Sequence, residues 1–259
     1  MGMLRALARL CALAALTGWA VATILCSRLF ARLAPKRMDQ LERRTTRCWA
    51  RGISRAFGMT VSTDGSPPRG RYILISNHLS YMDVLALMSV VDARFLSRAD
   101  VVDWPLVGPV VRFAGTLFVD RTRRGDLPRV LSEIDAVLAG GRGVVFFPEG
   151  TSSPGFRVLP FKPSLFEAAA RGGFEVACAS LHYRTPPNAT PAEWSVCWWG
   201  DMDFAPHIFA LLKIPRYEVR VRFSDQRFSH SDRKQLATAA REEVLRLFEP
   251  VCNADPTLP

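Results

Sequence analysis

The sequence lacks the motifs of several common enzyme classes, and each absence narrows the range of functions. There is no P-loop and no G-x-G-x-x-G fingerprint, the usual signals of nucleotide and dinucleotide sites. There is no G-x-S-x-G elbow, so a hydrolase serine is not indicated. The 6 cysteines form no C-x-x-C pair and show no metal-ligand spacing. We therefore expect no metal, no bound cofactor, and reduced thiols in a reducing compartment.

Acidic residues are scarce in the first 60 positions, where only Asp39 and Glu42 oppose a long series of lysines and arginines. The whole chain carries a formal net charge of +10. Such a basic segment is typical of proteins that bind nucleic acid or an anionic membrane surface. No nucleic-acid motif is present, and an apolar run lies within the basic segment. We therefore expect membrane lipids, and no nucleic acid, as partners.

The apolar run from Leu10 to Ser27 contains no charged residue. As a helix it would be about 27 Å long, just enough to cross a hydrocarbon core. We favour an uncleaved anchor over residues 1–34. A signal cleaved near residues 20–22 and a helix lying in the membrane interface are the alternatives. Basic residues are more numerous after the run than before it, which predicts a cytoplasmic catalytic domain at the bacterial inner membrane.

The remaining chain divides into three parts. Residues 35–66 read as a basic amphipathic interfacial segment, with a helix over 39–57, and residues 251–259 read as a disordered tail. Residues 67–250 alternate between strand-type and helix-type runs, which predicts an α/β domain with a mixed sheet flanked by helices. The predicted strands are 72–77, 93–98, 116–120, 143–148, 175–183, 194–200 and 216–224. The predicted helices are 82–91, 105–114, 126–139, 163–172, 203–212 and 231–249.

His78 and Asp83 are the first candidate catalytic pair. They lie where a strand-type run passes into a helix-type run. Ligands of open α/β sheets bind at the carboxyl ends of strands, where His78 would lie. A carboxylate on one imidazole nitrogen orients the ring, and the other nitrogen can then take a proton from a hydroxyl or thiol. The alternative is a purely structural role, in which Ser80 to Asp83 only form a capping box at the start of a helix.

Two further stretches place polar residues at strand ends. Residues 115–121 end in Asp120 and Arg121. The planar guanidinium of arginine can donate two parallel hydrogen bonds to a phosphate or carboxylate. Residues 143–153 contain a very apolar strand that runs into a turn presenting Glu149, Gly150 and Thr151. A cation, Lys162, precedes the next helix-type run.

The three stretches together, in this order, resemble the glycerolipid acyltransferase family typified by lysophosphatidate acyltransferase. The resemblance covers about residues 60 to 185 and includes the amino-terminal membrane segment. The matching blocks are Asn77-His78-x-x-x-x-Asp83, Gly115-x-x-Phe118-Val119-Asp120-Arg121 and Phe147-Pro148-Glu149-Gly150-Thr151.

The resemblance implies acyl transfer from acyl-CoA or acyl carrier protein to the hydroxyl of a lysolipid, without a metal. It implies that His78 is the general base and Asp83 its orienting partner. Arg121 would hold the acceptor phosphate, and the turn at 149–151 would bind the acceptor, with Lys162 as a further cation. The expected acceptor is 1-acylglycerol-3-phosphate, giving phosphatidic acid.

The chain departs from the family pattern at Ser152, where the third block usually continues with an arginine. The prolines of the usual fourth block are also missing from Val176–Ser180. Bacterial enzymes that acylate lyso-ornithine lipid have similar third blocks, so this acceptor is the main alternative. Trp198–Asp203 offers aromatic and acidic groups to an amino-acid head group, although a strand end and a helix cap explain these residues as well. The remaining alternative is a catalytically silent lipid-binding protein of the same fold, against which the intact His78 and Asp83 argue.

Overall fold

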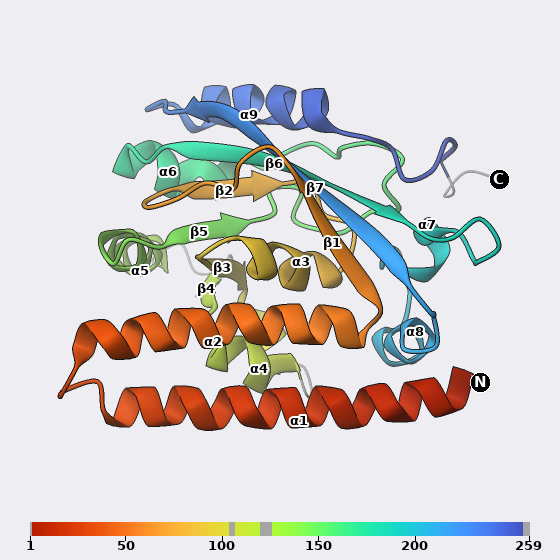
Figure 1. Cartoon of the computed structure of the whole chain (residues 1–259). Helices are drawn as coiled ribbons and strands as arrows, with labels where there is room; N and C mark the ends of the chain where they lie inside the picture. Colours follow the sequence, from red (N-terminus) through yellow and green to blue (C-terminus); the bar gives the residue numbers. More distant parts are fainter. Residues whose placement is uncertain (1, 104–106, 120–125, 256–259) are drawn as a thin grey trace.

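A computed structural model describes residues 2–103, 107–119 and 126–255. Its centre is a 7-stranded sheet with the strand order β1-β7-β6-β2-β5-β3-β4 (Figure 1). Strands β6 and β7 are antiparallel, and the other neighbours are parallel, so the sheet is mixed as predicted. The strands are β1 (Met59–Asp64), β2 (Ile73–Ser76), β3 (Ala93–Arg98), β4 (Leu117–Val119), β5 (Gly143–Phe146), β6 (Val176–Arg184) and β7 (Tyr217–Phe228).

Helices cover both faces of this sheet. They are α1 (Gly2–Leu29), α2 (Pro35–Ala56), α3 (Met82–Val90), α4 (Val107–Phe113), α5 (Leu127–Ala139), α6 (Glu167–Gly172), α7 (Ala192–Ser195), α8 (Phe204–Leu211) and α9 (Arg233–Leu247), with 3-10 turns at Ala99–Asp103 and Pro163–Phe166. One apolar cluster joins α2 and α3 to the sheet, and a second joins α5, α6 and α9 to its other face. Strands β2 and β5 are buried at every position, because parallel central strands are covered on both sides.

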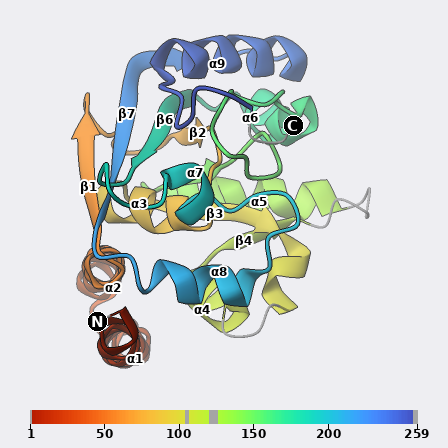
Figure 2. The same ribbon diagram turned by 90° about the vertical axis from the view of Figure 1, so that its right-hand side faces the viewer.

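Helix α1 runs antiparallel to α2, along the edge of the domain (Figures 1 and 2). The guanidinium groups of Arg5 and Arg9 donate to backbone carbonyls of residues 212–215 at 2.6–3.0 Å. Near the middle of α1, Trp49 Nε1 of α2 donates to Thr17 at 3.2 Å. Helix α1 is therefore attached to the domain along much of its length.

Among the described residues, α1 is the one helix long and apolar enough to cross a membrane, by length and composition alone. Only 17% of its apolar window is buried inside the protein. Large apolar side chains on α1 and just after it remain exposed; they include Leu4, Leu7, Trp19, Leu25 and Leu33. This exposed surface is the property expected of a helix that contacts lipid.

The structure differs from the sequence predictions at three places. Residues 194–200 form no strand, because both edges of β6 are already paired, with β2 and β7. Strand β1, within the segment 35–66, was not predicted, although Met59 and Val61 alternate with polar residues. It pairs with β7. The segment after Pro250 is ordered as far as Asp255, since Val251 donates its N–H to the Gly155 carbonyl at 2.8 Å.

Candidate active site

His78 and Asp83 meet at the turn from β2 into α3, as the sequence predicts. His78 lies two residues after β2 ends, and Asp83 lies in the first turn of α3. Their side chains are joined by a 2.7 Å hydrogen bond between His78 Nδ1 and Asp83 Oδ2. Because a carboxylate can only accept, this bond places the proton on Nδ1 and leaves the lone pair of the neutral imidazole on Nε2.

The Asp83 carboxylate is fully buried and surrounded by donors. Its Oδ2 also accepts from the backbone N–H groups of Leu79 at 2.7 Å and Ser80 at 3.0 Å. Its Oδ1 accepts from the Tyr183 hydroxyl at 2.8 Å. These bonds offset the cost of burying a charge. Asp83 therefore organises the start of α3 and orients His78 at the same time, so the capping role and the dyad role are combined in one side chain.

Tyr183 also belongs to this site, although the sequence motifs do not include it. It lies on β6, 100 residues away from its partner Asp83. Burial strongly raises the pKa of its phenol, which keeps the hydroxyl protonated as a donor. The sequence does contain a signal for this contact: a tyrosine in an otherwise apolar buried strand needs a hydrogen-bond partner for its hydroxyl.

The His78 ring is held by stacking and remains partly accessible. It stacks on Phe147, with ring centroids 4.0 Å apart and an interplanar angle of 11°. The side chain keeps 20% of its surface exposed. Among the described residues no partner contacts Nε2, so this nitrogen is available to a substrate hydroxyl. Phe147, which follows β5, is thus both part of the core and a wall of the site.

The backbone of His78 is tied to the third motif block. Its carbonyl accepts from Ser153 N–H at 3.0 Å, and its own N–H donates to Glu149 Oε1 at 3.4 Å. The neighbouring Ser152 hydroxyl donates to the Trp198 carbonyl, and Trp198 N–H donates to the Leu79 carbonyl at 2.9 Å. The structure therefore brings the first block, the third block and the Trp198 segment together at one end of the sheet.

Glu149 lies under this site and not at its surface. Only 2% of the residue is exposed, and its Oε2 is buried without a hydrogen-bond partner. Burial, reinforced by the nearby Asp83 charge and opposed by the His78 N–H bond, raises the pKa of Glu149 to about 9. Its carboxyl is therefore neutral near pH 7. The sequence predicts that Glu149 binds the acceptor; this role stays a prediction, although the buried side chain offers an acceptor little surface.

The other residues of the third block lie at the surface. Gly150 has a φ of 73°, a left-handed conformation that favours glycine. A Cβ at Gly150 would lie 2.8 Å from Lys162 Nζ, so the lysine side chain covers the turn. Thr151 and Lys162 are both exposed. Arg121, expected to hold an acceptor phosphate, lies outside the described residues, as do Asp120, Arg123 and Arg124.

The family model described as Acyltransferase matches residues 59–181, which include all three motif blocks. A lyso-ornithine lipid O-acyltransferase from Brucella abortus is 34% identical over 221 residues, covering 80% of this chain and 83% of that protein. The chain belongs to the acyltransferase family. A second lyso-ornithine lipid O-acyltransferase, from Rhizobium meliloti, is 30% identical to this acyltransferase over 82% of the chain and 83% of the relative.

This acyltransferase also resembles proteins named for another acceptor. A 1-acyl-sn-glycerol-3-phosphate acyltransferase from Neisseria meningitidis is 27% identical over 67% of the chain and 68% of that protein. The crystal structure of a 1-acyl-sn-glycerophosphate acyltransferase from Thermotoga maritima matches with a TM-score of 0.66 at 18% identity, covering 95% of this chain and 98% of that one. The structural match shows that the two chains share a fold. The relatives together show a lysolipid acyltransferase.

Proposed function

We propose that this acyltransferase moves a fatty acyl group from a thioester donor to the hydroxyl of lyso-ornithine lipid. His78 Nε2 accepts the hydroxyl proton as the oxygen attacks the thioester carbonyl. Asp83 holds the ring and stabilises the imidazolium that forms. The tetrahedral intermediate then breaks its C–S bond, and the leaving thiolate takes the proton from Nε2. The observation that supports this chemistry is the buried Asp83 on Nδ1 with Nε2 left open.

The choice of acceptor rests on Ser152. Where the phosphate-acylating members of the family usually carry an arginine, this chain has a hydroxyl, and that hydroxyl donates to the Trp198 carbonyl. The position therefore offers no cation to a phosphate head group. The sequence by itself favours lysophosphatidate, but the relatives that match most of this chain at 30% identity or more are named for lyso-ornithine lipid. We therefore rank lyso-ornithine lipid first.

Lysophosphatidate is the second candidate acceptor, and Lys162 favours it. The lysine side chain lies over the Gly150 turn, next to the exposed Thr151, where it could contact a phosphate. The relatives from Neisseria are named for this acceptor. Both candidates use the same dyad, so they differ in head-group recognition and not in the chemical step.

A panel assay distinguishes the candidates. Purified protein is given lyso-ornithine lipid or lysophosphatidate, each with labelled acyl-CoA or acyl carrier protein as donor. We expect lyso-ornithine lipid to be acylated at the higher kcat/KM. The variant His78→Ala should lose about two to four orders of magnitude in rate, as expected for loss of a general base, while its thermal unfolding stays cooperative. Acylation of lysophosphatidate alone would reverse the ranking, and an active His78→Ala would overturn the role of the dyad.

The protein acts at a membrane in this proposal, since its substrates are lipids. The exposed apolar surface of α1 supplies the contact, and the exposed arginines of α2, such as Arg37 and Arg44, supply attraction to anionic lipid. Because α1 is attached to the domain at Arg5, Arg9 and Trp49, we place it along one face of the bilayer and not across it.

A further inference from the structure

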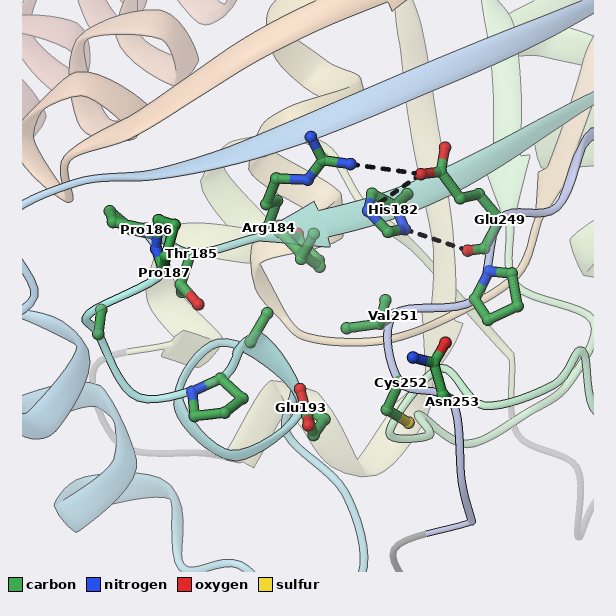
Figure 3. Close-up of a pocket in the computed structure, with 15 residues that line it drawn as sticks. His182, Arg184, Thr185, Pro186, Pro187, Glu193, Glu249, Val251, Cys252 and Asn253 are labelled. Carbon is green, nitrogen blue, oxygen red and sulfur yellow. Dashed lines mark hydrogen bonds and ion pairs between the residues drawn. The ribbon is translucent and has the colours of Figure 1, made fainter.

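A cavity of about 430 Å³ lies at the carboxyl end of β6, between the loop that leads to α7 and the segment that follows α9 (Figure 3). Its volume lies within the range of about 300–1,000 Å³ that is typical of small-ligand sites. On β6, the side chains of Leu181 and Tyr183 enter the cluster that contains α3. Because side chains alternate along a strand, His182 and Arg184 point to the other face of the sheet, toward the cavity.

Residues that line the cavity are hydrogen-bonded to the region of the His78–Asp83 dyad. Tyr183 is among the residues that line it, and its hydroxyl, on the core side of β6, donates to Asp83 at 2.8 Å. Val251, which also lines the cavity, donates its N–H to the Gly155 carbonyl at 2.8 Å. Two residues before Gly155, Ser153 donates its N–H to the His78 carbonyl at 3.0 Å. Hydrogen bonds through residues 153–155 therefore connect the wall of this cavity to the His78 backbone.

The cationic side of the cavity is Arg184. Glu249, beside it, is already held by Arg222 at 2.6 Å and by Arg220 at 3.3 Å. Arg184 is 3.6 Å from Glu249 and keeps 61% of its side-chain surface exposed. Burial lowers the pKa of His182, so this ring adds no full charge near pH 7. Arg184 therefore keeps free N–H groups for a ligand carboxylate.

The anionic side of the cavity is Glu193, which lies across from Arg184 and Glu249 in Figure 3. Among the described residues no hydrogen bond or ion pair reaches the Glu193 carboxylate. Polyanions such as nucleotide phosphates are disfavoured here, because Glu193 and Glu249 would repel them. A ligand with one cationic group and one anionic group would place the first on Glu193 and the second on Arg184.

We propose that this cavity binds the amino-acid head group of the acceptor, with the side-chain ammonium of ornithine on Glu193 and its carboxylate on Arg184. The proposal rests on the proposed function, since it assigns the head group of that same acceptor. It adds a recognition site that lies outside the motif blocks. Lysophosphatidate, which has no ammonium group, would gain nothing from Glu193.

The test measures kinetics of Glu193→Gln and Arg184→Gln with both acceptors. Each substitution removes one charge-assisted contact, so each should raise the KM for lyso-ornithine lipid about ten- to hundred-fold with kcat nearly unchanged. The KM for any residual lysophosphatidate acylation should stay constant in Glu193→Gln, because that acceptor has no ammonium group. Nα-acetylornithine, the head group without its long chain, should inhibit the wild type in competition with the lipid and inhibit Glu193→Gln more weakly.

Glu133→Gln and Arg171→Gln serve as matched controls, because they remove one charge of each sign from partly or largely exposed positions on α5 and α6, away from the cavity. Unchanged KM values in Glu193→Gln and Arg184→Gln, with lyso-ornithine lipid acylated by the wild type, would overturn the head-group site alone. A wild type that acylates lysophosphatidate and not lyso-ornithine lipid would overturn the proposed function, and the assignment of this cavity with it.

Discussion

At the residue scale, the Asp83 carboxylate accepts from the His78 imidazole, from two backbone N–H groups and from the Tyr183 hydroxyl. An amide at this position would bring an NH₂ group against donors that need an acceptor. Asp83→Asn should therefore lower kcat by about two to four orders of magnitude, because His78 loses the group that sets its tautomer. Steady-state kinetics on purified protein measures this loss.

Tyr183→Phe is the matched control for Asp83→Asn. It removes one hydrogen bond to the carboxylate and leaves the His78–Asp83 bond in place. It should cost about 1–3 kcal/mol of stability while keeping most of the rate. If Asp83→Asn were as active as the wild type, Asp83 would serve only to begin α3.

Glu149 leads to a prediction about pH. Its usual pKa is 4.5, and burial raises the pKa to about 9 in the folded protein. Between about pH 4.5 and 9 the folded protein keeps this proton and the unfolded chain loses it, so the free energy of unfolding falls as the pH rises across that window. Above about pH 9 both states are ionised at this position, and its contribution no longer changes.

Glu149→Gln should remove this slope, because the amide is neutral at every pH and nearly the same shape. Thermal unfolding from about pH 5 to 9 should show the variant gaining in melting temperature over the wild type as the pH rises. Its activity near pH 7 should stay close to that of the wild type, whereas Glu149→Ala, which leaves a cavity beneath His78, should be unstable. Loss of activity in a stable Glu149→Gln would show that the carboxylate itself contacts substrate.

At the scale of elements, α1 has the composition of a spanning helix but the contacts of a helix bound to its own domain. Arg5 and Arg9 donate to residues 212–215, and α2 runs beside it. Crossing a bilayer would require these bonds to break. We therefore expect both termini of the chain on the same side of the membrane.

Epitope tags at the two termini test this expectation in inverted and right-side-out vesicles. Both tags should be digested by protease from the cytoplasmic side and protected from the other side. The control is a known single-span protein that carries the same tags. An N-terminal tag accessible only from the non-cytoplasmic side would establish that α1 spans the bilayer.

At the scale of the whole molecule, the formal net charge of +10 is unevenly placed. Helix α2 carries exposed arginines beside the apolar surface of α1. The cations of α9 lie on the far side of the domain, away from that surface. Binding to vesicles that contain anionic lipid should therefore exceed binding to zwitterionic vesicles, and added salt should reduce the difference by screening.

The charge-neutralised variant Arg37→Gln with Arg44→Gln should weaken binding to anionic vesicles by about tenfold or more, at about 1 kcal/mol for each cation near the surface. The matched control, Arg233→Gln with Lys234→Gln, removes two cations from α9 and should bind like the wild type. Equal weakening in both variants would mean that net charge, and not the orientation set by α1 and α2, determines binding. Vesicle cosedimentation measures binding of the wild type and of both double variants.

Local patterns in the sequence were enough to determine the mixed α/β sheet, the helices that flank it, and the pairing of His78 with Asp83. The reason is distance along the chain: a strand-to-helix turn brings two residues only five positions apart into contact without help from the rest of the fold.

The tertiary structure alone decided the features that depend on distant parts of the chain. Tyr183 reaches Asp83 from a strand 100 residues away, β1 pairs with β7 near the other end of the chain, and residues 194–200 form no strand because the edges of β6 are occupied. In the sequence, Glu149 is a glutamate that a turn presents after a very apolar strand, but only packing shows that it is buried and that its carboxyl is neutral. Burial and long-range pairing are set by which surfaces meet in three dimensions, and local residue patterns carry little information about that choice.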